Sequence, residues 1–104
     1  MYTLRTTKIF DRKLKNLQTI FGLTDSQTRE IIAEIKELMI ELQETGTVPA
    51  QYQDHLLKRE PWIGYHEFHV LDDLLVIYFK IESKSVIRMV TITNHEELRT
   101  GKFI

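Results

Sequence analysis

LLVIYFKIESKSVIRMVTIT, residues 74–93, is the stretch that decides the fold. Two runs of β-branched, aromatic and aliphatic residues, Leu74–Ile81 and Val86–Thr93, flank a polar break of four residues. Runs of this composition are typical of strands. Because a parallel crossover needs a dozen residues or more, so short a break predicts an antiparallel hairpin.

Two further strands are predicted outside this hairpin. Residues 65–70 have a similar composition and are separated from the hairpin by the turn pair Asp72-Asp73, while residues 2–6 alternate weakly between polar and apolar. We therefore expect a small, mainly antiparallel sheet.

Apolar residues recur at helical spacing in two segments that lie between the first strand and the others. The first helix is expected to end at Gly22, and the second begins with the capping-box spacing of Thr24 and Gln27 and ends before Gly46. The apolar stripes are Phe10, Leu14, Leu17 and Phe21, then Ile31, Ile32, Ile35, Leu38, Met39 and Leu42. The sequence thus predicts an α+β fold in the order β-α-α-β-β-β, with a helical hairpin on one sheet face and the other face free for a site.

Length and composition favour one domain over residues 1–104. A chain of 104 residues, 42% of them hydrophobic, can cover one core. The chain has no cysteine, which excludes disulfides and thiolate chemistry. Its start lacks the basic and apolar regions of a signal peptide, and no apolar run approaches the ~20 residues that span a membrane. We expect a cytoplasmic protein without a membrane segment.

The net charge of -1 conceals an uneven distribution. Residues 1–22 hold five basic residues and one acidic residue, whereas residues 23–47 hold two basic and six acidic residues. Lys8, Arg12 and Lys15 share one stripe of the first helix. The simpler explanation of this basic stripe is that it is the solvent-exposed face of an amphipathic helix. If the protein meets a polyanion such as RNA, we expect this stripe to face it.

Three histidines in the C-terminal half, His55, His69 and His95, are the candidate acid-base groups. Imidazole has a pKa of about 6.5 and can give or accept a proton near neutrality. RNA carries its own nucleophile, the 2′-hydroxyl, so its cleavage needs a base, an acid for the departing 5′-oxygen and positive charge near the phosphate. Each histidine also has a structural explanation, as a loop cap, a half-buried strand residue or a strand-end cap.

Neither a metal site nor an aromatic stacking platform is expected. The histidines and aspartates lack compact zinc-motif spacing, and HEFH at residues 66–69 is not HExxH. His66 and His69 should face opposite sides of a strand and share no metal, so His66 is expected to be structural or on the surface. Trp62 and Tyr65 could stack on RNA bases, but packing explains them better.

Ordered short motifs in the second half resemble the YafQ branch of the RelE/ParE toxin superfamily. They are PAQYQDHLL at 49–57, WIGY at 62–65, HV at 69–70 followed by Asp73, LVIY at 75–78, and TNH at 93–95 followed by Leu98. Members of this family are small bacterial mRNA endonucleases of type II toxin–antitoxin systems that act on the ribosome. The predicted element order fits the family's fold.

The resemblance implies a catalytic set of His55, His69, Asp73 and His95, which match the polar residues of the family's active site. We assign His69 and Asp73 to the base side, His95 to the acid side, and His55 to positioning or charge stabilisation. Contacts to RNA or rRNA are assigned to Lys8, Arg12, Lys15, Arg88, Arg99 and Phe103.

The chain departs from the family pattern at Leu74, Thr91 and Arg99, where the family often has tryptophan, arginine and phenylalanine. Arg88, Arg99 and Phe103 could compensate in space, although Arg88 lies three residues from Thr91 and should point to the opposite strand face. The departures affect phosphate binding and base stacking, not the acid-base set.

The resemblance therefore implies a toxin that cleaves mRNA in the ribosomal A site, needs no metal or cofactor, and inhibits translation. It also implies a cognate antitoxin that neutralises the toxin and through which the complex would bind operator DNA. Two alternatives remain: a non-catalytic toxin of the same fold that binds a protein such as gyrase, and an inactive remnant that binds antitoxin. A protein binder would not need all three histidines.

Overall fold

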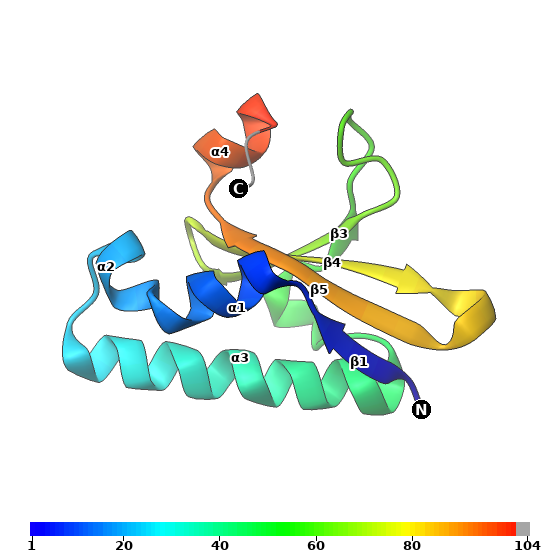
Figure 1. The fold of residues 1–104 in the computed structure, drawn as a ribbon, viewed down its shortest axis with the longest axis horizontal. Helices are drawn as coiled ribbons and strands as arrows, with labels where there is room; N and C mark the ends of the chain where they lie inside the picture. The colour runs from blue at the N-terminus through cyan, green and yellow to red at the C-terminus, as the bar shows by residue number, and fades with distance from the viewer. Residues whose placement is uncertain (102–104) are drawn as a thin grey trace.

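In the computed structural model, which describes residues 1–101, helices cover one face of a five-stranded sheet (Figure 1). The strands lie in the order β1-β5-β4-β3-β2. They are β1 (Thr3–Thr6), β2 (His55–Leu56), β3 (His66–Leu71), β4 (Leu74–Ile81) and β5 (Val86–Thr93). The helices are α1 (Lys8–Lys15), α2 (Leu17–Phe21), α3 (Asp25–Thr45) and α4 (His95–Thr100), with 3-10 turns at Ala50–Tyr52 and Glu82–Lys84.

The sheet is mixed but mainly antiparallel, as predicted. β1 runs parallel to β5, and every other pairing is antiparallel. The central hairpin of β4 and β5 has the predicted bounds, and β3 is shifted by one residue from the predicted 65–70. The two-residue strand β2 was not predicted, because so short a segment has no periodicity to detect.

The first helical segment differs from the prediction of one helix. The chain breaks at Asn16, which ends α1 and precedes α2. The side-chain amide of Asn16 donates to the carbonyl of Arg12 at 2.9 Å, and such local bonds compete with continued helix. The apolar stripe runs through the break, so spacing alone did not reveal it. The second segment is confirmed, with Thr24 and Gln27 forming the expected reciprocal capping box.

Strand alternation gives the sheet two different faces. The face under α1 and α3 contributes fully buried residues such as Phe68, Val76 and Ile87 to the main core. The other face carries a smaller apolar cluster built on Trp62, Leu75, Ile77 and Val90. In Figure 1, α4 rises from the end of β5 on the side away from α1 and α3. The second face is therefore left open beside α4.

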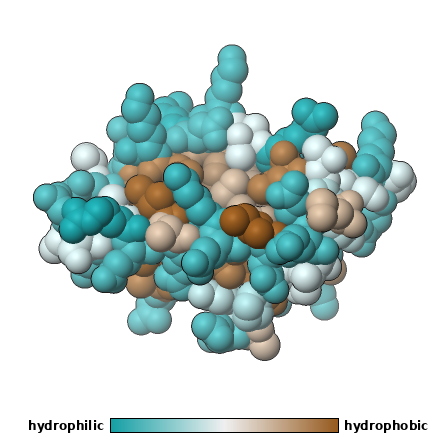
Figure 2. Space-filling view, turned by 90° about the horizontal axis from the view of Figure 1, so that it is seen from below, coloured by the Kyte–Doolittle hydropathy of each residue, from teal (hydrophilic) through white to brown (hydrophobic). Residues whose placement is uncertain are grey.

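The outer surface of the helical layer is mainly hydrophilic, with apolar side chains gathered in patches between charged ones (Figure 2). Ile40 of α3 and Ile20 of α2 are exposed apolar residues. None of the helices within residues 1–101 is long and apolar enough to cross a membrane.

Candidate active site

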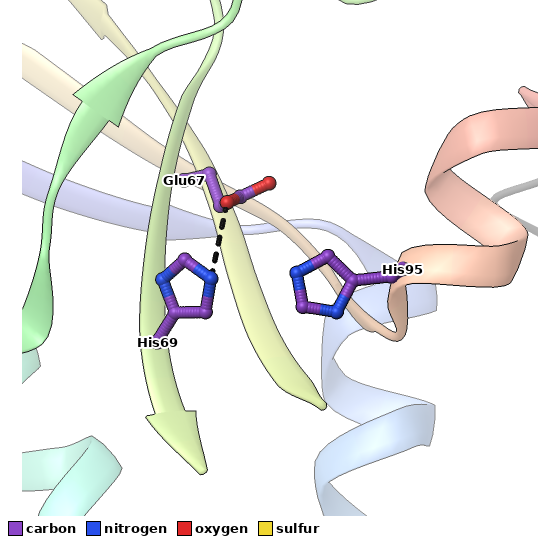
Figure 3. Close-up of side chains that lie close together, drawn as sticks. All are labelled: Glu67, His69 and His95. Atoms are coloured by element: carbon purple, nitrogen blue, oxygen red, sulfur yellow. Dashed lines mark ion pairs between the residues drawn. The ribbon is translucent and has the colours of Figure 1, made fainter. Parts of the chain in front are cut away.

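Four titratable side chains meet on the open face of the sheet. His55 on β2 pairs across the ladder with Glu67 on β3, and His69 lies two residues further along β3 on the same side as Glu67. His95 begins α4, directly after β5. Figure 3 shows the rings of His69 and His95 facing one another, with the Glu67 carboxylate beside the space between them.

Glu67 lies at the centre of this group, and the sequence interpretation did not include it. Only 3% of Glu67 is exposed, and its Oε1 lies 3.4 Å from His55 Nε2 and 3.5 Å from His69 Nε2. The His55 and His69 rings stack with centroids 6.2 Å apart, and the His69 and His95 rings are 5.4 Å apart. A buried carboxylate needs positively charged or hydrogen-bonding partners, and the two histidines supply them. The structure thus brings together three of the predicted residues, His55, His69 and His95.

The fourth predicted residue, Asp73, pairs with His95 and not with His69. Its Oδ1 accepts a hydrogen bond from the backbone N–H of His95 at 2.9 Å and lies 2.7 Å from His95 Nδ1. The backbone bond first, and the ring bond second, lower the pKa of Asp73 below its ordinary value. An ionised Asp73 favours a proton on His95 Nδ1, which leaves Nε2 available to a substrate. The structure thus pairs Asp73 with His95, and not with His69 as the sequence analysis had grouped it.

Helix α4, which carries His95, is held on two sides. Its N-terminus is capped by Asn94, whose Oδ1 accepts from the amide of Glu97 at 2.8 Å. The Glu97 carboxylate accepts from Thr93 at 2.9 Å and lies 3.7 Å from the buried ammonium of Lys13 on α1. On the other side, the indole of Trp62 donates to the carbonyl of Leu98 at 3.0 Å. These contacts fix the direction in which His95 enters the site.

Two hollows flank the histidines. One, of about 340 Å³, lies beside His95 and is mainly apolar with two arginines. The other hollow, of about 790 Å³, is more open and has His69 in its lining. The first is lined by Leu57, Arg59, Trp62, His95, Leu98 and Arg99. The second is lined by Gln51, Gln53, His69, Val70, Leu71, Asp72 and Asp73.

The predicted RNA-contacting residues are scattered. Arg99 lines the hollow beside His95, whereas Arg88 lines a different hollow with Tyr65 and Phe79. The basic stripe of Lys8, Arg12 and Lys15 is exposed on α1, outside both hollows that flank the histidines. Phe103 lies outside the described residues.

The structural interpretation of His66 is confirmed. It lies on the opposite face of β3 from His69, because it pairs with the core residue Tyr78 and stacks on its ring at 4.8 Å. Asp54 binds both, accepting from the Tyr78 hydroxyl and lying 3.3 Å from His66 Nδ1. Burial and this carboxylate raise the pKa of Tyr78. The network anchors the segment that leads into His55.

The packing interpretation of Trp62 is confirmed, because the residue is buried within the smaller apolar cluster. Two of the three divergent positions are buried as well. Leu74 lies in the main core, and Thr91 is fully buried. Neither divergent position is open to a substrate.

The fold is shared with solved structures of small bacterial toxins. The YoeB/ParE toxin from Agrobacterium tumefaciens superposes with a TM-score of 0.68 at 15% identity, covering 89% of this chain and 98% of that one. A metal-bound toxin from Helicobacter pylori gives a TM-score of 0.68 at 26% identity over 94% and 99% of the two chains. The E. coli DinJ-YafQ complex gives 0.68 at 24% identity over 94% and 98%.

The family follows from the sequence. The family model described as the bacterial toxin of type II toxin-antitoxin system, YafQ, matches residues 2–100. This chain belongs to the YafQ family. A comparison with curated proteins gives no match.

Proposed function

We propose that the protein is a ribosome-dependent mRNA endonuclease that cleaves through attack of the RNA 2′-hydroxyl on the adjacent phosphate. The observation that carries this proposal is the convergence of three histidines, Glu67 and Asp73 on one open sheet face. Such a set supplies both halves of general acid-base catalysis without a metal or cofactor. Family membership supports a toxin role.

His95 is the proposed acid. In the protonated ring, Nδ1–H points to Asp73 and Nε2–H can be given to the departing 5′-oxygen. The Asp73 carboxylate holds the ring in place and stabilises its positive charge before the proton leaves. Both bonds to Asp73 come from His95, so the carboxylate acts through this histidine.

His69 and Glu67 form the proposed base side, which replaces the earlier pairing of His69 with Asp73. The Glu67 carboxylate lies 3.5 Å from His69 Nε2, and either group can remove the 2′-hydroxyl proton. His55 has acceptors at both ring nitrogens, the Gln53 carbonyl at Nδ1 and Glu67 at Nε2. This arrangement suits a positively charged His55 that stabilises the pentacoordinate phosphate.

The hollows on either side of the histidines suit single-stranded RNA. The apolar floor and two arginines beside His95 can receive one base and its phosphate, while the more polar hollow beside His69 can take the chain on the other side. The chain has a net charge of -1, so free RNA is expected to bind weakly. Presentation of the mRNA by the ribosomal A site would overcome this weak binding.

A cognate antitoxin is the proposed protein partner. The E. coli relative is described as a DinJ-YafQ toxin-antitoxin complex, and we extend that kind of partner to this chain. Exposed apolar residues such as Ile40, Leu56 and Leu71 offer surface for it to cover. Operator DNA would be bound through the antitoxin, and the toxin would act on ribosomes in the cytoplasm.

Primer extension on a reporter mRNA in a purified translation system tests the proposal. Wild-type protein should cut only when ribosomes are present, cutting should persist with EDTA-treated toxin, and His95→Ala should weaken it at least ~100-fold. An mRNA carrying a 2′-deoxynucleotide at the cut position should resist. Loss of translation without any cut would favour the alternative, a toxin that binds a protein target.

Arg88→Gln provides the matched control for that assay. Arg88 is an exposed charged residue in a separate hollow, away from the two hollows that flank the histidines. The Arg88→Gln substitution should reduce cutting by no more than a few-fold, whereas His95→Ala removes the proposed general acid. Equal losses in both variants would indicate that charge, and not proton transfer, limits the reaction.

A further inference from the structure

A third hollow lies on the open face of the sheet, apart from the two that flank the histidines. It has a volume of about 220 Å³ and is bordered by the partly buried rings of Tyr65 and Phe79. The Tyr65 ring also contacts Trp62, which lines the hollow beside His95, with ring centroids 5.5 Å apart. The third hollow therefore continues from the one beside His95. Its lining residues are Thr7, Tyr65, Phe79, Ile81, Arg88 and Val90.

A β-bulge brings Arg88 to this face. A spacing of three residues predicts that Arg88 and Thr91 face opposite sides of β5. In the structure, however, Thr91 pairs with Ile77 and Arg88 pairs with Phe79, and Val90 is the extra residue of the bulge. Ile77 and Phe79 are alternate residues of β4, and both belong to the open-face cluster. The bulge thus turns the Arg88 side chain toward the hollow.

Arg5 lies beside Arg88 on the neighbouring strand. The two residues are register partners in the parallel pairing of β1 with β5, so their side chains extend from the same face. Both are exposed, and within residues 1–101 neither forms an ion pair. Two like charges at paired positions destabilise a sheet. An anion bound between the two guanidinium groups would relieve this repulsion.

The hollow and the two arginines have the composition of a site for one nucleotide. Arginine binds phosphate through paired N–H donors, and an aromatic ring stacks on an unpaired base. The rings of Tyr65 and Phe79 lie with centroids 5.0 Å apart, and Phe79 is the register partner of Arg88. No acidic side chain is among the described residues that line the hollow. Base and phosphate can therefore be bound side by side.

We infer that this hollow binds one nucleotide of the mRNA strand on the 3′ side of the cut, with its base on Phe79 and its phosphate between the two arginines. The direction rests on the proposed function. His95 protonates the departing 5′-oxygen, so the hollow beside His95 receives the nucleotide that carries this oxygen. The third hollow lies beyond it and takes the nucleotide that follows.

Binding of a short, fluorescently labelled single-stranded RNA, made uncleavable by 2′-fluoro groups, tests the site without ribosomes or activity. In fluorescence anisotropy at low salt, Phe79→Ala should weaken binding at least ~5-fold, because the stacking surface is lost. Phe79→Leu keeps a large apolar side chain but no aromatic face, and it should weaken binding by a similar factor. A wild-type affinity in Phe79→Leu would show that the ring only packs, and it would overturn the stacking role.

The arginines are tested by the salt dependence of the same binding. Replacing Arg5 and Arg88 together by glutamine should lower the slope of log affinity against log salt by about 0.7, the contribution of one phosphate contact to a single strand. Arg88→Gln alone leaves Arg5 in place and should weaken binding only a few-fold. The matched control replaces Arg29 and Lys36 by glutamine, which removes the same charge from the exposed surface of α3 and should leave the slope unchanged. Equal slopes in the two double variants overturn the phosphate contact.

The position of the nucleotide is tested on ribosome-bound mRNA. Removing the base of the second nucleotide 3′ of the cut should slow cutting by wild type at least ~5-fold and cutting by Phe79→Ala less than ~2-fold, because the variant has already lost the stack. Removing a base at the same distance on the 5′ side should affect both proteins equally. Equal sensitivity of the two proteins at the 3′ position overturns the assignment. If wild type cuts no mRNA, the proposed function fails, while anisotropy still decides whether the hollow binds RNA.

Discussion

The two faces of the sheet share the same strands and differ in what they present. On β3, Phe68 is fully buried beneath the helical layer, whereas its neighbours Glu67 and His69 lie on the open face. The helical face is apolar and continuous, and the open face concentrates titratable groups beside two hollows. Because alternate residues of one strand serve the two faces, stability and activity should separate at adjacent positions.

The largest effect is expected on the helical face. Phe68→Ala removes a fully buried ring that packs near Tyr52 and Tyr78, and should lower the free energy of unfolding by about 3–5 kcal/mol. Urea denaturation monitored by circular dichroism measures this change. A loss below about 1 kcal/mol would mean that the helical layer does not pack on β3 as described.

His69→Ala sharpens the comparison one residue away. Cutting of ribosome-bound mRNA should fall by ~100-fold or more, because a proton acceptor is removed. The free energy of unfolding should change by less than about 1 kcal/mol, since the His69 side chain is not part of the main core. Purified variants are compared by primer extension and by urea denaturation. A variant that is unfolded, or one that cuts normally, would break the separation of the two faces.

A third test stays within the helical layer. A methyl group at Gly46, whose φ is +79°, would lie 2.5 Å from a ring carbon of Tyr2, so Gly46→Ala should cost about 1–3 kcal/mol. Gly22 has a φ of +62° but no atom within 4 Å of an added methyl. Gly22→Ala should therefore cost less, about 1 kcal/mol. Thermal unfolding of the pair measures the difference, and equal midpoints would argue against the Tyr2 contact.

The smallest expected effect is on the open face. Asp73 is exposed and its pKa is lowered by its bonds from His95, so its contribution to stability is present above its ordinary pKa and is lost as the pH falls through the lowered value. Asp73→Asn should cost no more than about 1 kcal/mol near neutrality, because the pair is solvent-screened. The difference from wild type should shrink below about pH 4. A difference that grows in acid would contradict the sign of the shift.

Sequence patterns predicted the fold better than the site, for physical reasons. The bounds of β4 and β5 follow from contiguous apolar runs, and the cap at Thr24 follows from local spacing. The break between α1 and α2 at Asn16 could not be predicted in this way, because the apolar stripe continues across it.

The site depends on contacts between distant parts of the chain. Asp73 and His95 are 22 residues apart and meet only because α4 turns back over the open face. That helix has six residues and no apolar stripe, although Asn94 followed by Glu97 has N-cap spacing. Glu67 went unrecognised because a lone acidic residue in a strand carries no motif. Its position two residues before His69 was the available signal.

The central claim is that the open face performs catalysis and the helical face maintains the fold. We would measure ribosome-dependent primer extension for a variant in which His55, His69 and His95 are all replaced by alanine, after confirming its unfolding midpoint. Our account predicts a folded protein that leaves mRNA intact and no longer arrests growth. A folded triple variant that still cuts mRNA or still arrests growth would contradict it.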